Sequence, residues 1–289
     1  MSVLKVENLS YTYNVGMPGA TKALDNINLE IEEGSFVGVI GHTGCGKSTL
    51  IGHFNGLTKP QEGRILLDGK DIWTEYKDIR QVRFSVGLVF QYPEYQLFEE
   101  TCYKDIAFGP KNMGLSEEEV DSRVKMAAKF CGVSDEMLSG SPFDLSGGQK
   151  RRVAIAGIIA MKPKVLVLDE PCAGLDPAGR ELILSQVKNY HKTTGSTVIL
   201  VSHSMEDIAN YSDKVIVMEQ GTIYKYAPTE EIFKDAENLS RMGLGIPDIT
   251  QVFLKLKDMG VDIDTDVYTV PYAIKTLLKY KKAKENKNA

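Results

Sequence analysis

A segment of nine residues carries the residue types that bind phosphate: Gly41-His42-Thr43-Gly44-Cys45-Gly46-Lys47-Ser48-Thr49. The spacing Gly-x-x-x-x-Gly-Lys-Ser, between a buried apolar run and a helical pattern, is typical of a phosphate-binding loop. The glycines let backbone N–H groups turn toward phosphate oxygens, and the start of the next helix adds positive potential. We expect Lys47 to contact the β- and γ-phosphates and Ser48 to bind Mg²⁺. Cys45 is interpreted as a small loop residue, with a thiol of lowered pKa as the alternative.

Two carboxylates, Asp169 and Glu170, follow the apolar run 165–168. Ligands of α/β sheets gather at the carboxyl ends of the strands, so this pair should lie near the phosphate-binding loop. We expect Asp169 to bind Mg²⁺ through water and Glu170 to polarise an attacking water molecule. The alternative, a pair of solvated acids at a strand end, is less favoured because the phosphate-binding loop precedes them.

A third motif is the pentapeptide 145–149, which comprises Leu145, Ser146, Gly147, Gly148 and Gln149. Ser146 and Gln149 have the spacing of a helix N-cap and its N3 partner, so the two glycines can expose the first turn of a helix as an anion site. Three basic residues follow at 150–152, although a helix start normally favours acids. We interpret this basic run as part of an element that meets phosphate.

Short apolar segments must position these motifs. Segments 3–9 and 23–31 predict antiparallel strands, whereas segment 36–40 predicts a strand buried on both faces. Asp68-Gly69 predicts a hairpin turn. Segments 165–168, 197–201 and 214–218 predict parallel strands separated by helices, and the pattern is helical from about 116 onward. The fold class is therefore α/β, with an antiparallel β subdomain and an inserted helical subdomain at about 92–162.

The pattern changes after about residue 228. An amphipathic stripe of Ile249, Val252, Phe253 and Leu256 is followed by a predicted last helix at 272–280 and a Lys-rich end. We therefore divide the chain into a nucleotide-binding domain at 1–228 and a C-terminal accessory or dimerisation segment at 229–289.

The three motifs together resemble the nucleotide-binding domain of ATP-binding-cassette (ABC) proteins over about residues 3–228. The pentapeptide looks like the signature that, in this family, caps the γ-phosphate held by a second subunit, so the resemblance implies a dimeric catalytic unit with ATP and Mg²⁺. It also assigns further positions: Gln91 as the Q-loop glutamine that contacts Mg²⁺ and water, Asp176 as the end of the D-loop (173–176), His203 as the switch histidine and Tyr13 as the adenine-stacking residue. Tyr11 is the alternative stacking residue.

Segments 90–98 and 105–110 resemble the second ATPase type of energy-coupling factor importers, as does the C-terminal extension. This resemblance implies a second ABC ATPase subunit, a paralogue rather than a second copy. It also implies an integral membrane coupling subunit, a separate membrane subunit that selects the micronutrient, and a peripheral location on the cytoplasmic face of the cell membrane. Glu94, Glu99 and Glu100 are candidates for contacting the membrane partner, or they are solvated acids.

Composition limits the alternatives. The formal net charge of -5 argues against nucleic-acid binding, which requires a concentrated basic face. The four cysteines have neither zinc-site nor disulfide-framework spacing, and no window approaches the ~20 apolar residues of a membrane span. Two other functions stay open: the motor of another ABC importer, such as a cobalt or nickel type, and a soluble ABC regulatory ATPase. The second is less favoured because the chain shows one signature and no sustained heptads.

Overall fold

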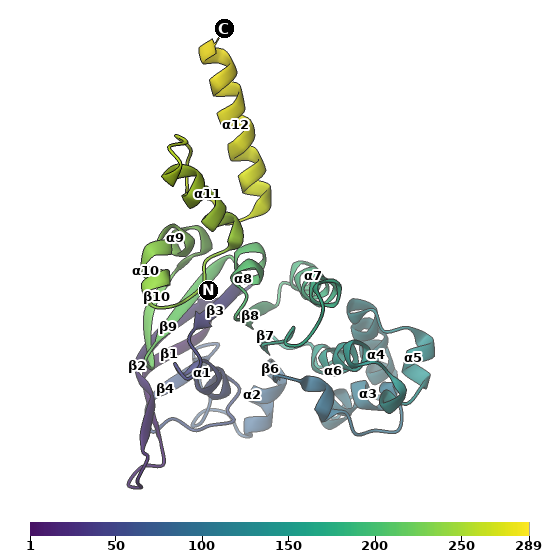
Figure 1. Cartoon of the computed structure of the whole chain (residues 1–289). Helices are drawn as coiled ribbons and strands as arrows, with labels where there is room; N and C mark the ends of the chain where they lie inside the picture. The colour runs from purple at the N-terminus through teal and green to yellow at the C-terminus, as the bar shows by residue number, and fades with distance from the viewer. Residues whose placement is uncertain (289) are drawn as a thin grey trace.

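Two β-sheets form the centre of the computed structural model, which describes residues 1–288 (Figure 1). The first sheet is antiparallel, with strand order β2-β1-β4-β5. Its strands are β1 (Ser2–Tyr13), β2 (Thr21–Glu32), β4 (Glu62–Leu67) and β5 (Lys70–Asp71). Asp68 and Gly69 have φ values of 51° and 77° in the turn between β4 and β5, which confirms the hairpin predicted there.

The second sheet has the order β10-β9-β3-β8-β7-β6. All of its strand pairs are parallel except that of β10 with β9, which is antiparallel. Its strands are β3 (Phe36–Gly41), β6 (Val86–Val89), β7 (Val165–Asp169), β8 (Thr197–Val201), β9 (Lys214–Glu219) and β10 (Thr222–Pro228). The predicted parallel strands are therefore confirmed.

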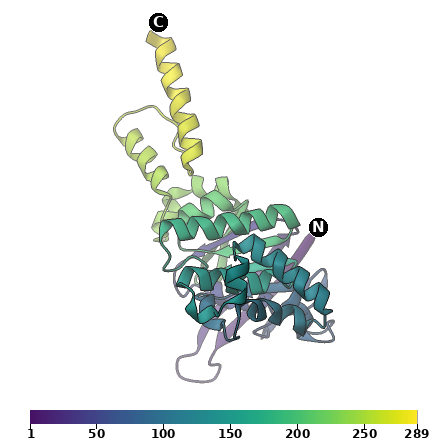
Figure 2. The ribbon, with the colours of Figure 1, turned by 90° about the vertical axis from the view of Figure 1, so that its right-hand side faces the viewer.

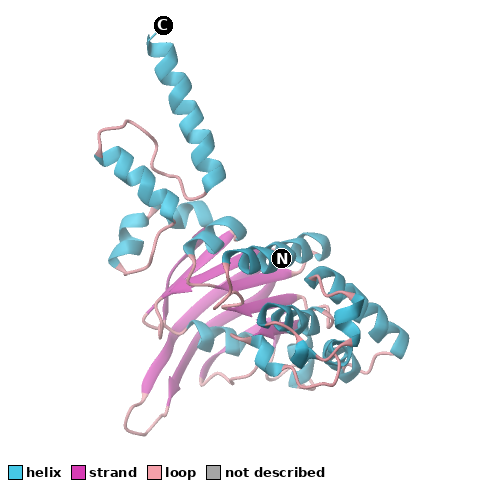
Figure 3. Ribbon diagram, turned by 45° about the vertical axis from the view of Figure 1, so that its right-hand side comes forward, coloured by secondary structure: helices cyan, strands magenta, loops and turns pink. Residues whose placement is uncertain are grey.

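The parallel strands are apolar throughout because both faces are buried. Alternate side chains point to opposite faces of a strand, so Val37 and Val39 pack toward the antiparallel sheet while Phe36 and Ile40 pack toward helices. Helices lie against the sheets in Figure 3. Those that follow β3, β5, β7, β8 and β10 are α1 (Lys47–Phe54), α2 (Ile79–Ser85), α7 (Pro177–Thr194), α8 (Met205–Tyr211), α9 (Thr229–Lys234) and α10 (Ala236–Arg241).

A group of helices lies to one side of the sheets, on the right in Figure 1 and in front in Figure 2. It comprises the 3-10 turn η1 (Pro93–Gln96), α3 (Cys102–Asn112), α4 (Glu117–Cys131), α5 (Asp135–Ser139), η2 (Pro142–Asp144) and α6 (Gly147–Ile159). Ser116 caps α4, and its predicted apolar positions Val120, Val124 and Cys131 are buried. The predicted helical insertion corresponds to this group.

The C-terminal part has a small core of its own. Helix α11 (Asp248–Asp258) contributes the buried Phe253, which packs with Ala273 of α12 (Val270–Asn288). Ile249 and Leu256 of the predicted apolar stripe pack against this core, whereas Val252 is 49% exposed and does not contribute to it. Helix α12 extends away from the sheets (Figures 1 and 2). No helix within residues 1–288 has the length and apolarity needed to cross a bilayer. The boundary at residue 228 stays a prediction.

Candidate functional site

The loop between β3 and α1 requires glycine at its last position. Gly46 precedes α1 with φ of 104°, and a Cβ there would lie 2.4 Å from the carbonyl oxygen of Ala23. Lys47, which is only 7% exposed, donates from Nζ to the carbonyl oxygens of Gly41 and His42 at 2.6 and 2.9 Å. The loop thus holds a buried ammonium group at the start of a helix, which is an arrangement suited to phosphate.

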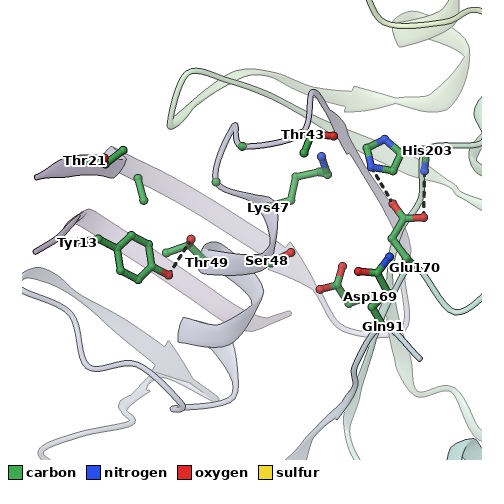
Figure 4. Close-up of a pocket in the computed structure, with 13 residues that line it drawn as sticks. Tyr13, Thr21, Thr43, Lys47, Ser48, Thr49, Gln91, Asp169, Glu170 and His203 are labelled. Carbon is green, nitrogen blue, oxygen red and sulfur yellow. Dashed lines mark hydrogen bonds and ion pairs between the residues drawn. The ribbon is translucent and has the colours of Figure 1, made fainter. Parts of the chain in front are cut away.

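A cavity of about 440 Å³ opens beside this loop and collects most of the predicted site residues (Figure 4). The loop and α1 contribute Thr43, Gly44, Gly46, Lys47, Ser48 and Thr49. Four polar residues that follow strands of the parallel sheet, or end one, lie on the other side: Gln91, Asp169, Glu170 and His203. Tyr13, Thr21 and Ala23 come from the antiparallel sheet, and no sequence pattern indicated the last two.

Ser48, Asp169 and Gln91 supply oxygen atoms in one part of this cavity (Figure 4). Burial raises the pKa of Asp169, whereas the Ser48 hydroxyl, which is hydrogen-bonded to it, and the charge of Lys47 lower that pKa. Mg²⁺ prefers oxygen ligands and keeps several waters, so it needs few from the protein. A hydroxyl, a carboxylate and an amide therefore fit Mg²⁺ beside a phosphate. Within residues 1–288 no larger group of His, Cys, Asp and Glu side chains could hold a metal by itself.

Glu170 has the ionisation properties of a general base. Burial raises its pKa to about 7, the neighbouring Asp169 adds to the rise, and a hydrogen bond from the backbone N–H of His203 at 3.4 Å opposes it. Its buried Oε1 lies 3.4 Å from His203 Nε2 and accepts no hydrogen bond from any described residue. A carboxylate with a free oxygen and a pKa near neutrality can accept a proton from water.

His203 follows β8 and lies beside Glu170 on the same side of the cavity. Burial and then the nearby Lys47 lower its pKa, which favours the neutral imidazole. A neutral ring carries one N–H donor, which can approach a phosphate oxygen without pairing permanently with Glu170.

Tyr13 lines the cavity and Tyr11 does not. The ring of Tyr13 is 43% exposed, and its hydroxyl lies 3.2 Å from Thr49 Oγ1. Tyr11 packs instead against His53. The structure thus favours Tyr13 as the residue that a base could stack on.

Three loop residues lie outside the lining of the cavity: Gly41, His42 and Cys45. The carbonyl oxygens of Gly41 and His42 face Lys47, whereas the His42 ring is hydrogen-bonded to the carbonyl oxygen of Met242 in the C-terminal part. Cys45 is buried, as expected of a small loop residue. We find no role for the His42 side chain toward a nucleotide.

The signature residues also lie outside the cavity. Ser146 and Gln149 form the predicted capping box at the start of α6, with Ser146 Oγ accepting from Gln149 N–H at 3.4 Å and Gln149 Oε1 accepting from Ser146 N–H at 2.9 Å. A Cβ on Gly147 would meet no atom within 4 Å, and one on Gly148 would meet only Leu175, at 4.0 Å. Asp176 caps α7 through Gly179 N–H. One chain therefore does not bring its signature to its own phosphate-binding loop.

In the basic run 150–152, two of the three residues bond within the chain, which corrects the interpretation of the sequence for Arg151 and Arg152 and leaves it a prediction for Lys150. Arg151 is buried and pairs with Glu94 at 2.7 Å, and Arg152 donates to the carbonyl oxygen of Gly132. Of the acids that were candidates for a partner contact, Glu94 is occupied by Arg151, which corrects that candidate, whereas Glu100 pairs with Lys104 at the exposed surface and stays a prediction together with Glu99. The Glu94–Arg151 pair joins residues 57 positions apart, so sequence spacing could not reveal it.

The sequence model of the family described as "ABC transporter" matches residues 24–173. A model described as an AAA domain of putative AbiEii toxins matches residues 141–207. Among curated proteins, the chain is 54% identical to the energy-coupling factor transporter ATP-binding protein EcfA2 of Caldanaerobacter subterraneus, over 98% of this chain and 99% of that protein. It is 53% identical to the EcfA2 of Clostridium acetobutylicum, over 96% and 97%.

Two solved structures have the same fold. One is cbiO1 from Clostridium perfringens, part of the ABC transporter complex cbiONQ, with a TM-score of 0.75 and 41% identity over 90% of this chain and 97% of that one. The other is the dimeric cassette MJ0796 in a post-hydrolysis state bound to ADP and phosphate, with a TM-score of 0.70 and 29% identity over 78% and 98%. The site geometry and these likenesses agree: the chain belongs to the ABC transporter family and, within it, to the energy-coupling factor transporter ATP-binding proteins, as an ATP-binding and ATP-hydrolysing subunit.

Proposed function

We propose that this chain drives a micronutrient importer by closing and reopening a sandwich with a second ABC ATPase subunit, a paralogue. Each nucleotide site then combines the cavity of one subunit with the signature of the other, because Ser146–Gln149 lie outside the cavity of their own chain. The dimeric relative bound to ADP and phosphate supports this arrangement. The observation that carries the proposal is the convergence of Lys47, Asp169, Glu170 and His203 on one cavity.

The residues of the cavity divide the chemistry of hydrolysis. Lys47 and the loop N–H groups hold the phosphates, Gln91 and Glu170 orient the attacking water, and Glu170 accepts its proton. His203 donates to a γ-phosphate oxygen. Ser48, Asp169 and Gln91 would hold Mg²⁺, which neutralises charge on the phosphate oxygens. Tyr13 stacks on adenine.

A hydrophobic groove is the expected docking site for the integral membrane coupling subunit. Phe98 and Phe108, which are 58% and 47% exposed, contact each other edge to face in a cavity that also includes Leu97, Ile158 and Met161. The groove lies beside η1, which follows Gln91, so an apolar helix seated there would contact the chain next to the nucleotide site. In this arrangement the chain sits on the cytoplasmic face of the membrane, a separate membrane subunit selects the substrate, and no nucleic acid is bound.

Substitution of the expected general base tests the proposal. Glu170→Gln should lower ATP turnover by about 10²–10⁴-fold, because the amide cannot accept the proton, while ATP binding persists. With ATP present, size-exclusion chromatography with light scattering should show more closed dimer for this variant than for the wild type. Glu219→Gln, at the end of β9, is the control and should behave as the wild type. Near-normal turnover of Glu170→Gln would remove Glu170 from its role.

The transport role needs a separate measurement. The full chain, affinity-purified from detergent-solubilised membranes, should bring with it a second ATPase and integral membrane proteins. Phe98→Asp together with Phe108→Asp should abolish the membrane component while the purified chain still binds ATP. Retention of that component would place its docking site elsewhere.

A further inference from the structure

A buried arginine connects three segments of the nucleotide site without lining its cavity. Arg151 lies in α6, and its side chain is only 3% exposed. Its Nε and Nη2 donate to the two carboxylate oxygens of Glu94 at 3.0 and 2.7 Å. Its Nη1 donates to the carbonyl oxygens of Pro171 and Ala173 at 3.1 and 2.7 Å, and the Tyr92 ring lies 5.7 Å from the guanidinium.

Each of these contacts leads to a residue with an assigned role. Glu94 lies in η1, three positions after Gln91. Pro171 directly follows Glu170, and Ala173 begins the D-loop. Arg151 itself lies two positions after the signature residue Gln149. One guanidinium thus spans the segment of Gln91, the segment of Glu170 and the helix that starts at the signature.

The geometry of this link depends on the guanidinium fork. A bidentate arginine–carboxylate pair fixes direction as well as distance, and lysine cannot reproduce it. Arg151 and Glu94 are both largely buried, so the loss of one partner leaves the other charge uncompensated in a region of low dielectric. The backbone after Glu170 is therefore held by the same side chain that holds η1.

We propose that Arg151, together with Glu94, is a positioning pair that sets Gln91 and Glu170 in register for hydrolysis and transmits movement of η1 to the segment after Glu170. The inference rests on the proposed function. Arg151 touches neither the nucleotide cavity nor the groove lined by Phe98 and Phe108. Its substitution should therefore change the rate of the chemical step and leave nucleotide binding intact.

Steady-state kinetics of the full-length chain assembled with its partner cassette test this inference, because each proposed nucleotide site needs the signature of the other subunit. Arg151→Lys keeps the charge but loses the fork, and it should lower kcat about 10- to 100-fold through misplacement of the reacting groups. The KM for ATP, and the Kd for a non-hydrolysable ATP analogue, should stay within about threefold of the wild type. Arg152→Lys is the matched control, since the Arg152 guanidinium donates to the Gly132 carbonyl oxygen and does not join the link to Glu94. The kcat of this variant should stay within about twofold of the wild type.

A double-mutant cycle separates positioning from folding. Glu94→Gln should reduce kcat by a similar factor. The kcat of the double variant Arg151→Lys/Glu94→Gln should be no more than about threefold lower than that of the less active single variant, because all three variants break the same link. Melting curves correct each rate for the folded fraction. A wild-type kcat per folded Arg151→Lys chain, or single effects that multiply, would overturn the inference. If Glu170→Gln also kept wild-type turnover, the proposed function itself would fail, and the inference with it.

Discussion

Side-chain polar atoms that line the nucleotide cavity still have hydrogen-bonding positions free, whereas the polar side chains of the signature turn are hydrogen-bonded to each other. Glu170 Oε1 accepts no hydrogen bond within the described chain, and burial raises the pKa values of Glu170 and Asp169. Ser146 and Gln149 instead bond each other, and the glycines between them face open space. The cavity is therefore built for reaction and the signature turn for presentation of backbone N–H groups. Substitutions in the cavity should therefore change both ATP affinity and turnover, whereas substitutions in the signature turn should change turnover alone.

Lys47→Ala should give the largest effect and should act on binding as well as rate. Loss of a charged donor to phosphate weakens ATP affinity by about 10- to 100-fold and lowers turnover by about 10³-fold. Isothermal titration and a phosphate-release assay measure the two. Lys129→Ala, exposed on α4, serves as the control. An ATP affinity of Lys47→Ala equal to that of the wild type would show that the cavity does not bind the nucleotide.

Gly147→Asp should reduce turnover by about 10²-fold while the ATP affinity of the isolated chain stays unchanged, because the added charge repels phosphate held by the partner cassette. An acid at the start of α6 favours the helix, so the melting temperature should not fall. Gly147→Ala controls for size, since its Cβ meets no atom within 4 Å. A loss of affinity in the monomer would break the division between the two regions.

The pH profile should report the ionisation of Glu170 in the cavity. Its carboxylate must be ionised to accept a proton, and its pKa is about 7, so kcat should rise about tenfold between pH 6 and pH 8. Stopped-flow measurement of a single turnover at saturating ATP isolates this step. The Gly147→Asp variant should retain the same midpoint at a lower rate. A midpoint near 4.5 would show that burial does not control this group.

The free energy of unfolding should also depend on pH in a defined direction. The folded chain disfavours ionised Glu170, because burial raises its pKa from 4.5 to about 7. The resulting destabilisation is absent below about pH 4.5 and complete above about pH 7, so Glu170→Gln should stabilise the chain at pH 8 by on the order of 2 kcal/mol and much less at pH 5. Urea denaturation at both pH values measures the difference. Equal gains at both would contradict the assignment.

Local sequence patterns predicted much of the fold and of the cavity, because strand burial and helix capping depend on residues that are close in the sequence. The run 165–168 reads as a doubly buried strand, and Ser146 with Gln149 reads as a capping box, since both depend on neighbours within four residues. Tyr13 and Gln91 came from family resemblance, and both line the cavity.

Long-range pairing accounts for the errors. The sequence shows Arg151 and Arg152 as an exposed basic run because arginine is rarely buried. Burial of Arg151 depends on Glu94 and on two carbonyl oxygens about 20 residues downstream, and no local pattern encodes that meeting. His42 was predicted only as part of the phosphate-binding loop, and its ring bonds to the carbonyl oxygen of Met242, 200 residues away, a contact that no local pattern predicts.

The separation of the cavity from the signature turn has a genetic consequence in a pair of unlike cassettes. Under the proposed arrangement of two cassettes, a lesion at Lys47 would disable the site that holds this chain's own nucleotide, whereas a lesion at Gly147 would disable the site in which the partner holds its nucleotide. Two alleles of one gene therefore map to two different active sites. A lesion at Lys47 of this chain should accordingly share its phenotype with a signature lesion in the partner's gene.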